Sequence, residues 1–96
     1  MGGRKMYRYV VPVDDQAHVF TLTANPVVVA AATGPRSHIV EFWAENDEDP
    51  GWERWFQVFG TGHTLPAGAK WTGTCPRTAL GLVWHLYEVN APGGEV

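Results

Sequence analysis

The sequence predicts an all-β protein, a small antiparallel sandwich or barrel of about seven short strands. Apolar and polar residues alternate over short runs, and Pro, Gly, Asn and Asp separate these runs. No segment combines apolar residues at helical spacing over three turns with a cap, so helices are not expected. Strands that follow one another without intervening helices are typical of sandwiches and small barrels.

Three of the expected strands lie in the first third of the chain. Residues 5–13 (KMYRYVVPV) alternate in the strand pattern, and residues 18–23 (HVFTLT) resume it after the turn-like DDQA segment. Residues 26–32 (PVVVAAA) are β-branched and then small, which favours a strand. Gly and Pro in residues 33–37 (TGPRS) predict a hairpin turn after it.

Two longer, aromatic strands are expected next. Residues 38–45 (HIVEFWAE) alternate, the acidic residues 46–51 (NDEDPG) predict a solvated hairpin tip, and residues 52–60 (WERWFQVFG) resume the alternation. Aromatic side chains on both faces of this last strand indicate burial on both sides, or one face used for contacts. One face carries Trp52, Arg54, Phe56 and Val58, and the other carries Trp55, Gln57 and Phe59.

The last two expected strands are residues 70–75 (KWTGTC) and 80–89 (LGLVWHLYEV). A chain of 96 residues is too short for two separate cores, so we expect one domain over residues 1–96. The two ends, residues 1–5 and 90–96, are expected to be flexible.

Charge and cysteine content limit the function classes. The net charge is −3, and the basic residues are scattered apart from Arg4, Lys5 and Arg8, which argues against general nucleic-acid binding. The single cysteine, Cys75, allows no intrachain disulfide, which fits a reducing cytoplasm. No run reaches signal-peptide length at the N-terminus or the roughly 20 apolar residues of a membrane span, so no membrane association is expected.

A glycine-rich segment follows the fifth expected strand, with two glycines around a threonine and then a histidine. Phosphate-binding loops need a following helix and a lysine, whereas here Pro66 and another strand follow, so we favour a structural corner over a ligand-contacting loop. We expect His63 to hydrogen-bond the neighbouring turn, and His85 to be a core or rim histidine with its hydrogen bonds satisfied. The candidate ligand-binding residues are Gly60, Thr61, Gly62, His63 and His85.

Signatures of catalysis, metal binding and cofactor binding are missing from the sequence. The four histidines lack the close spacing that specifies a metal site, and the acidic run lacks the EF-hand spacing. Cys75 precedes Pro76 with no recognisable oxyanion-hole element, so a buried free thiol is expected rather than a nucleophile. We therefore expect a protein that is not an enzyme and that uses no metal and no cofactor.

Five tryptophans are too many for the interior of so small a core, so some of them should be partly exposed. Exposed aromatic clusters mark binding sites or oligomer interfaces, and we favour an interface here. Self-association is therefore expected. The candidate interface residues are Trp43, Trp52, Trp55 and Trp71.

Three elements carry a resemblance: Gly60–His63 with a proline nearby, the aromatic-x-Gly-Thr element Trp71–Thr74, and the final strand element Val83–Glu88. With the early YRYV strand, they resemble a family of small β-rich proteins of unknown activity from bacteriophages and their actinobacterial and other bacterial hosts. The resemblance extends from Tyr7 to Glu88 and implies a phage origin and a single β-rich domain. The positions that it singles out are Gly60, Thr61, Gly62, His63, Gly73, Thr74, His85 and Glu88.

Together, the aromatic excess and the implied phage origin lead to one expected function and two alternatives. We expect a phage accessory protein that binds a host or phage protein through its exposed tryptophans, in the cytoplasm of the host cell. One alternative is a small-ligand protein that binds a nucleotide signal of bacterial defence at Gly60–His63. The other is a decoration or structural protein of the virion.

Overall fold

The computed structural model describes residues 3–33 and 38–93, and over this part of the chain it contains seven strands and no helix. The predicted all-β class and strand number are confirmed. Apart from Thr33, the turn predicted at residues 33–37 lies outside the described residues. The strands are β1 Lys5–Pro12, β2 His18–Leu22, β3 Pro26–Thr33, β4 Ile39–Asn46, β5 Trp52–Gly60, β6 Lys70–Thr74 and β7 Trp84–Val89.

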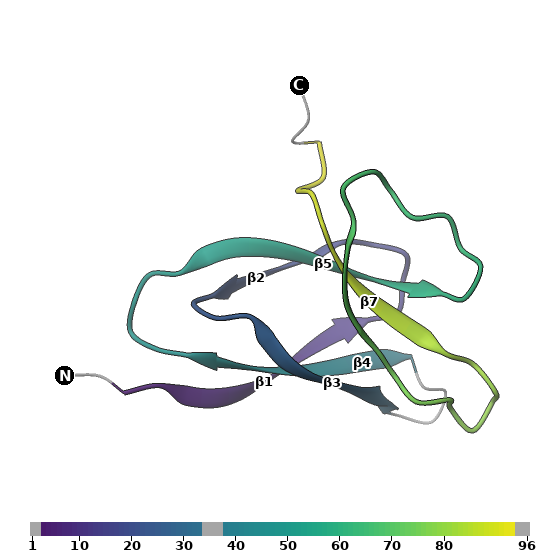
Figure 1. The fold of residues 1–96 in the computed structure, drawn as a ribbon, viewed down its shortest axis with the longest axis horizontal. Coiled ribbons are helices and arrows are strands. Elements are labelled where there is room, and N and C mark those ends of the chain that lie inside the picture. The colour runs from purple at the N-terminus through teal and green to yellow at the C-terminus, as the bar shows by residue number, and fades with distance from the viewer. Residues whose placement is uncertain (1–2, 34–37, 94–96) are drawn as a thin grey trace.

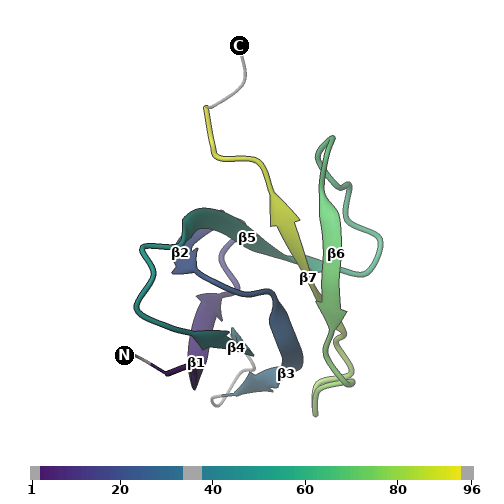
Figure 2. The same cartoon turned by 60° about the vertical axis from the view of Figure 1, so that its left-hand side comes forward.

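The strands form two antiparallel sheets that pack face to face as a sandwich, not a closed barrel. The three-stranded sheet has the order β1-β4-β3, and the four-stranded sheet has the order β2-β5-β7-β6. Figure 1 shows β1, β4 and β3 beneath β2 and β5, and Figure 2 shows β6 beside β7. The chain crosses between the sheets from β1 to β2, from β2 to β3 and from β4 to β5, so β1 pairs with β4, and β2 with β5, across long stretches of sequence.

The core is a layer of apolar side chains between the two sheets. Phe42 of β4 and Phe56 of β5 are both fully buried, with ring centroids 5.3 Å apart across the sandwich. Tyr9 of β1 stacks on Phe42 at 5.0 Å, so aromatic rings join three strands. Each ring buries about 150–250 Å², which makes this cluster the main source of stability. The buried core residues are Val11, Leu22, Val40, Phe42, Ala44, Phe56, Val58, Cys75 and Leu86.

Successive side chains of β5 point to opposite faces of the four-stranded sheet, as the alternation predicts. Phe56 faces the core, whereas Phe59 lies on the outer face and is still only 7% exposed. Residues 61–69, which connect β5 to β6, run over this face beside Phe59. The four-stranded sheet is therefore covered on part of its outer face as well as on its inner face.

Gly73 lets β6 approach β3 closely. The register of β6 against β7 shifts between Trp71 and Gly73, so Thr72 forms a bulge. A Cβ atom at Gly73 would lie 2.5 Å from Cγ2 of Val29 on β3, which only glycine avoids without a shift of the backbone or of Val29. Glycine at this position fixes the distance between the two sheets at this edge.

An ion pair closes the sandwich at its rim. Arg54 donates from Nε and Nη2 to the two carboxylate oxygens of Glu88, at 2.9 and 2.8 Å, and its guanidinium lies over the Phe56 ring. The hydrogen bonds from Arg54 hold the pKa of Glu88 below its ordinary value, and Lys70 adds to this shift. Over residues 3–33 and 38–93, no helix is long and apolar enough to cross a membrane.

Candidate functional site

The Gly60–His63 segment is a tight turn at the end of β5. The N–H of His63 donates to the carbonyl oxygen of Gly60 at 3.1 Å, which is the hydrogen bond that defines a β-turn. Gly62 has φ of +90°, which glycine adopts without steric cost. The imidazole of His63 accepts a hydrogen bond at Nδ1 from the Gly60 N–H, at 3.1 Å. The expected bond between His63 and its turn is therefore present.

These bonds decide how the turn can contact a ligand. Two of its backbone N–H groups, those of Gly60 and His63, already donate within the turn. An anion at this loop would therefore be bound by the N–H groups of Thr61 and Gly62, and by side chains nearby. Thr61, Gly62 and His63 are all exposed, so the turn is open to such a partner.

His85 links this turn to the edge strand β6. Its Nε2 lies 2.9 Å from Oγ1 of Thr61, and its Nδ1 lies 3.0 Å from Oγ1 of Thr74. The indole Nε1 of Trp71 donates to the same Thr74 oxygen at 2.9 Å. A single chain of hydrogen bonds thus runs from Trp71 through Thr74 and His85 to Thr61. Both ring nitrogens of His85 are satisfied, as expected for a rim histidine.

The donor at the start of this chain fixes the direction of its first hydrogen bond, and the tautomer of His85 sets the direction of the other two. An indole N–H can only donate, so Thr74 accepts from Trp71. When the Thr74 hydroxyl donates to Nδ1 of His85, the proton of the neutral ring is on Nε2 and points to Thr61. The Thr61 oxygen then accepts from His85, and its own hydroxyl proton is left to donate outward. We call these four residues the relay.

Two hollows flank the turn. One of about 330 Å³ is lined by Thr61, His63 and Arg77 on its polar side and by Leu82, Val83 and Trp84 on its apolar side. Arg77 is held by a hydrogen bond from Nη1 to the carbonyl oxygen of Gly81, at 3.0 Å. The smaller hollow, of about 160 Å³, lies on the other side, over Phe59 and His85. The larger one is within the volume range of small-molecule sites.

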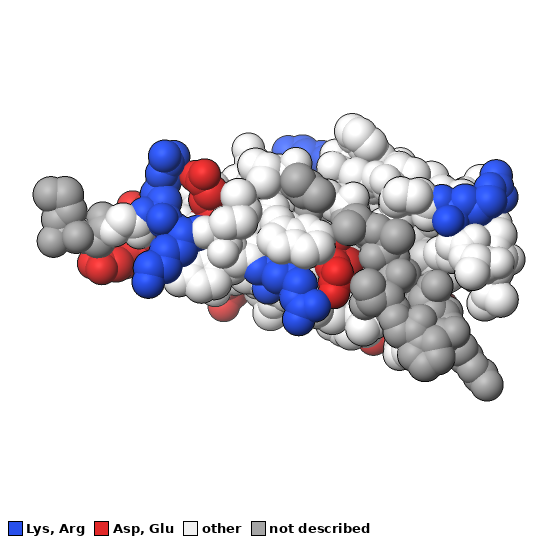
Figure 3. Space-filling view, turned by 90° about the horizontal axis from the view of Figure 1, so that it is seen from below, with Lys and Arg blue, Asp and Glu red and all other residues white. Residues whose placement is uncertain are grey.

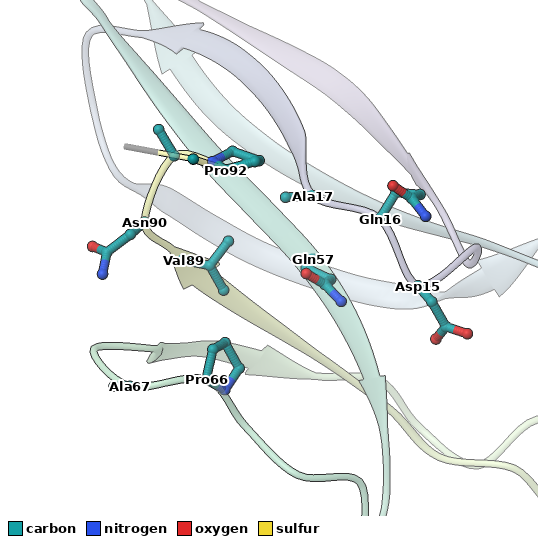
Figure 4. Close-up of a pocket in the computed structure, with 11 residues that line it drawn as sticks. Asp15, Gln16, Ala17, Gln57, Pro66, Ala67, Val89, Asn90 and Pro92 are labelled. Atoms are coloured by element: carbon teal, nitrogen blue, oxygen red, sulfur yellow. The ribbon is translucent and has the colours of Figure 1, made fainter. Parts of the chain in front are cut away.

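The largest of these three hollows, about 410 Å³, lies on the outer face of the four-stranded sheet. Gln57 of β5 and Val89 of β7 contribute to it from adjacent strands. Figure 4 shows three separate segments around them, residues 15–17, residues 66–67 and the chain after Val89. Asp15, in the first segment, has φ of +60°, an uncommon backbone conformation for any residue but glycine.

The structure separates the four candidate interface tryptophans. Trp43 lies opposite Arg8 on the outer face of the three-stranded sheet. Trp55 and Trp71 lie on the outer face of the four-stranded sheet, where Trp71 is 63% exposed and faces Tyr87 on the neighbouring strand. Trp52, at the start of β5, is 71% exposed on the other side of that sheet. Only Trp55 and Trp71 share a face with the largest hollow and the relay.

Charges are mixed on the surface. Figure 3 shows Lys and Arg next to Asp and Glu, with neutral side chains between them. The outer face of the three-stranded sheet, for example, carries an ion pair of 2.6 Å between Arg8 and Glu41. Among the residues that the structure describes, no group of three His, Cys, Asp or Glu side chains is placed to hold a metal ion.

The turn and the satisfied hydrogen bonds of His85 were predicted from the sequence, but the contacts that connect His85 to the turn were not. Thr74 was singled out only by resemblance, and neither Arg77 nor Gln57 was considered as a site residue. Alternation within a strand shows which residues share a face, so Thr74 and His85 could be assigned faces separately. Their contact depends on the register of β6 against β7, which the bulge at Thr72 shifts.

Comparisons with known proteins assign a family but no activity. No curated protein and no solved structure matches the chain. A family model described as a domain of unknown function, DUF7352, matches residues 3–95, nearly the whole chain. The protein therefore belongs to the DUF7352 family.

Proposed function

We propose that the protein acts by binding a protein partner on the outer face of its four-stranded sheet. The observation that supports this proposal is an aromatic surface beside a hollow. Trp71 is 63% exposed there, Tyr87 lies next to it, and Trp55 faces Val89 at the edge of the hollow. Aromatic side chains near a hollow, one of them largely exposed, are typical of protein contact surfaces.

The lining of the largest hollow indicates what the partner inserts. The polar side chains among its 11 lining residues are those of Asp15, Gln16, Gln57 and Asn90, and none of the 11 is a lysine or arginine. Prolines and alanines form much of the rest, which suits the aliphatic stem of a long side chain. We propose that the partner inserts a lysine or arginine, whose charge meets Asp15.

The biological setting of this proposal comes from the resemblance to phage proteins. We propose that the chain is a phage accessory protein without enzymatic activity, and that its partner is a protein of the host or of the phage. In a variant of this proposal, the partner is a protein of the phage particle, and the chain is a structural component of the virion. This variant predicts that the protein is recovered at high copy number from purified particles.

The test compares tryptophans on opposite faces. Wild-type protein, Trp71→Ala and Trp43→Ala are immobilised, exposed to lysate of infected host cells, and the retained proteins are identified by mass spectrometry. The proposal expects one protein to be retained by the wild type and by Trp43→Ala but lost from Trp71→Ala. Substitution of Asp15 by Asn should weaken the same complex. Equal retention by Trp71→Ala, or no retained protein, would contradict the proposal.

A second function is supported by the relay, which ends beside the larger of the two flanking hollows. Thr61 can donate its hydroxyl there, Arg77 supplies a positive charge, and Leu82 and Trp84 supply apolar surface. We propose as the alternative that a small anionic molecule with a flat apolar part binds at this hollow. A nucleotide has this combination of groups.

Thermal shift assays with nucleoside monophosphates, cyclic dinucleotides and inorganic phosphate test the alternative. A ligand at 100 times its dissociation constant adds about 2.7 kcal/mol of stability, which gives a clear increase in Tm. Thr61→Val and Arg77→Met should remove the shift, whereas Thr64→Val, at an exposed position of the same connection, should keep it. No shift with any of these probes would count against a nucleotide site.

A further inference from the structure

We propose that two copies of the chain pair through the free edge of β1, so that two three-stranded sheets become one continuous antiparallel sheet. This interface is separate from the outer face of the four-stranded sheet and does not depend on the function proposed above. A sheet edge carries unpaired N–H and C=O groups, and a second antiparallel strand satisfies them. Four features of β1 favour such pairing: its regularity, its hydrogen-bond pattern, its exposed side chains and its charges.

Of the four sheet edges, the edge of β1 is the most regular. The edge strands β2 and β6 have five residues each, and β6 also carries the bulge at Thr72. The pairing of β3 with β4 contains two register shifts. In contrast, all eight residues of β1 pair with β4 without a shift. Short strands and bulges protect edges from pairing, and β1 has neither.

The hydrogen bonds of β1 show which backbone groups face outward. The N–H of Val13 donates to the carbonyl oxygen of His38, in continuation of the register of β1 with β4. Hydrogen-bonded residues alternate along an antiparallel ladder, so the odd-numbered residues of β1 point their backbone groups toward β4. The even-numbered residues Met6, Arg8 and Val10 therefore direct N–H and C=O to the free edge. Pro12 ends this row because it has no N–H.

Exposed side chains on β1 are suited to a second copy of the same strand. Met6 is 51% exposed, Tyr7 is 46% exposed and Val10 is 36% exposed. Antiparallel pairing centred on Arg8 sets Met6 opposite the partner's Val10, and Tyr7 opposite the partner's Tyr9. The first pair covers apolar surface on the outer face, and the second extends the aromatic core on the inner face.

The charges along β1 are compatible with this register. The two Arg8 side chains meet at the centre, but each already pairs with Glu41 of its own chain at 2.6 Å. Lys5, and Arg4, which also pairs with Glu45 of its own chain at 3.1 Å, come to lie beside the end of the partner's β1, just before the partner's Asp14 and the partner's Asp15. The basic start of each β1 thus meets the acidic segment that follows the partner's β1. This charge complementarity favours the antiparallel arrangement over a parallel one.

Sedimentation velocity on the full chain tests the proposal at concentrations up to about 100 μM, the range of weak dimers. The wild type should be a dimer and Val10→Pro a monomer, because proline removes an outward N–H and no bond to β4. Val10→Lys, which introduces a charge opposite the partner's Met6, should also be monomeric. Trp71→Ala should remain dimeric. A monomeric wild type, or a dimer that persists in Val10→Lys, would overturn the proposal, as would a dimer that only Trp71→Ala disrupts.

Hydrogen exchange locates the interface independently of any variant. In the dimer, the amides of Met6, Arg8 and Val10 should be protected, and their protection should fall on dilution. The amides of Tyr7 and Tyr9, which face β4, should stay protected at all concentrations. Fast exchange at Arg8 under conditions where the protein is dimeric would show that the copies pair elsewhere.

Discussion

The two faces of the four-stranded sheet both carry aromatic rings but hold them differently. On the inner face, Phe56 packs against Phe42 of the opposite sheet, and the cluster around them is almost entirely apolar. On the outer face, Phe59 contacts Tyr87 edge to face, at 5.6 Å, beside the hydrogen-bonded His85. The inner rings are held by packing, and the outer ones are held among specific polar contacts and loops.

We expect the inner face to determine the stability of the fold and the outer face to determine the proposed binding. Packing against a second sheet depends on volume, so changes on the inner face should lower the free energy of unfolding. The outer face is built on residues whose hydroxyl, imidazole and indole groups have defined partners. Changes there should alter contacts with other molecules and have small effects on stability. Four predictions test this separation.

The largest effect is expected at the centre of the inner face. Phe56→Ala should lower the free energy of unfolding by about 3–5 kcal/mol, because it leaves a cavity between the sheets. Phe59→Ala should cost less, because its ring is covered by a connecting loop and not by a sheet. Urea denaturation followed by fluorescence measures both. An equal or greater loss for Phe59→Ala would show that the faces do not differ in this way.

Cys75 belongs to the same core layer, so the reactivity of its thiol tests whether that layer is buried. Burial raises its pKa from 9.0 to about 11, which lowers the thiolate fraction at pH 8 roughly 100-fold. Native protein should therefore react with a thiol reagent about 100 times more slowly than unfolded protein, or more slowly still. The variant Cys75→Ala/Thr64→Cys, with its thiol on the exposed connection, is the control and should react rapidly. Rapid reaction of native wild type would contradict the buried position.

A smaller effect is expected at the rim. Glu88→Gln should cost about 1–2 kcal/mol at neutral pH, because Arg54 loses its charged acceptor. The pKa of Glu88 is lowered in the folded state, so its contribution is complete above its unfolded value near 4.5 and is lost as the pH falls through the lower folded value.

Wild-type stability should therefore fall more steeply in acid than that of Glu88→Gln, as measured by denaturation at several pH values. Glu53→Gln, on the exposed outer side of β5, is the matched control and should change stability by less than about 0.5 kcal/mol. Parallel pH profiles for the wild type and Glu88→Gln would contradict the assigned role of the ion pair.

The smallest change in stability is expected within the relay. Thr74→Val removes the acceptor of the Trp71 indole but lies on the surface, so it should cost at most about 1 kcal/mol. Its specific effect is faster exchange of the Trp71 indole proton, observed by NMR. Thr72→Val, at the neighbouring bulge position, should leave that exchange rate unchanged. A slow indole proton in Thr74→Val would mean that the relay does not begin at Trp71.

Much of the fold was predictable because strand periodicity is a local property. All seven strands occur within a few residues of their expected ranges, and the two faces of β5 were assigned correctly. The choice between a sandwich and a barrel was not predictable from the sequence. It depends on the strand order β2-β5-β7-β6, which involves pairings between segments distant in sequence. The start of the last strand was also misjudged, since residues 80–83 precede β7, whereas its end at Val89 was predicted correctly.

The candidate site was predictable only in part. The turn and the hydrogen bond of His63 follow from local sequence, whereas the contact of His85 with Thr61 and Thr74 joins three separate segments. Alternation could not show which face of a strand is inner. For this reason Trp43 was grouped with Trp55 and Trp71, although the sheets direct them to opposite sides of the molecule.

The exposed indole at the start of the relay also gives the protein a built-in optical signal. The emission of a tryptophan responds to its solvent exposure and to the partner of its N–H group, and Trp71 is 63% exposed with one defined partner. A molecule that covers the outer face shields the Trp71 ring from water directly. A molecule that binds Thr61 alters the hydrogen bonds of the relay, which begins at Trp71. Steady-state fluorescence of the unlabelled protein should therefore follow either kind of binding in real time.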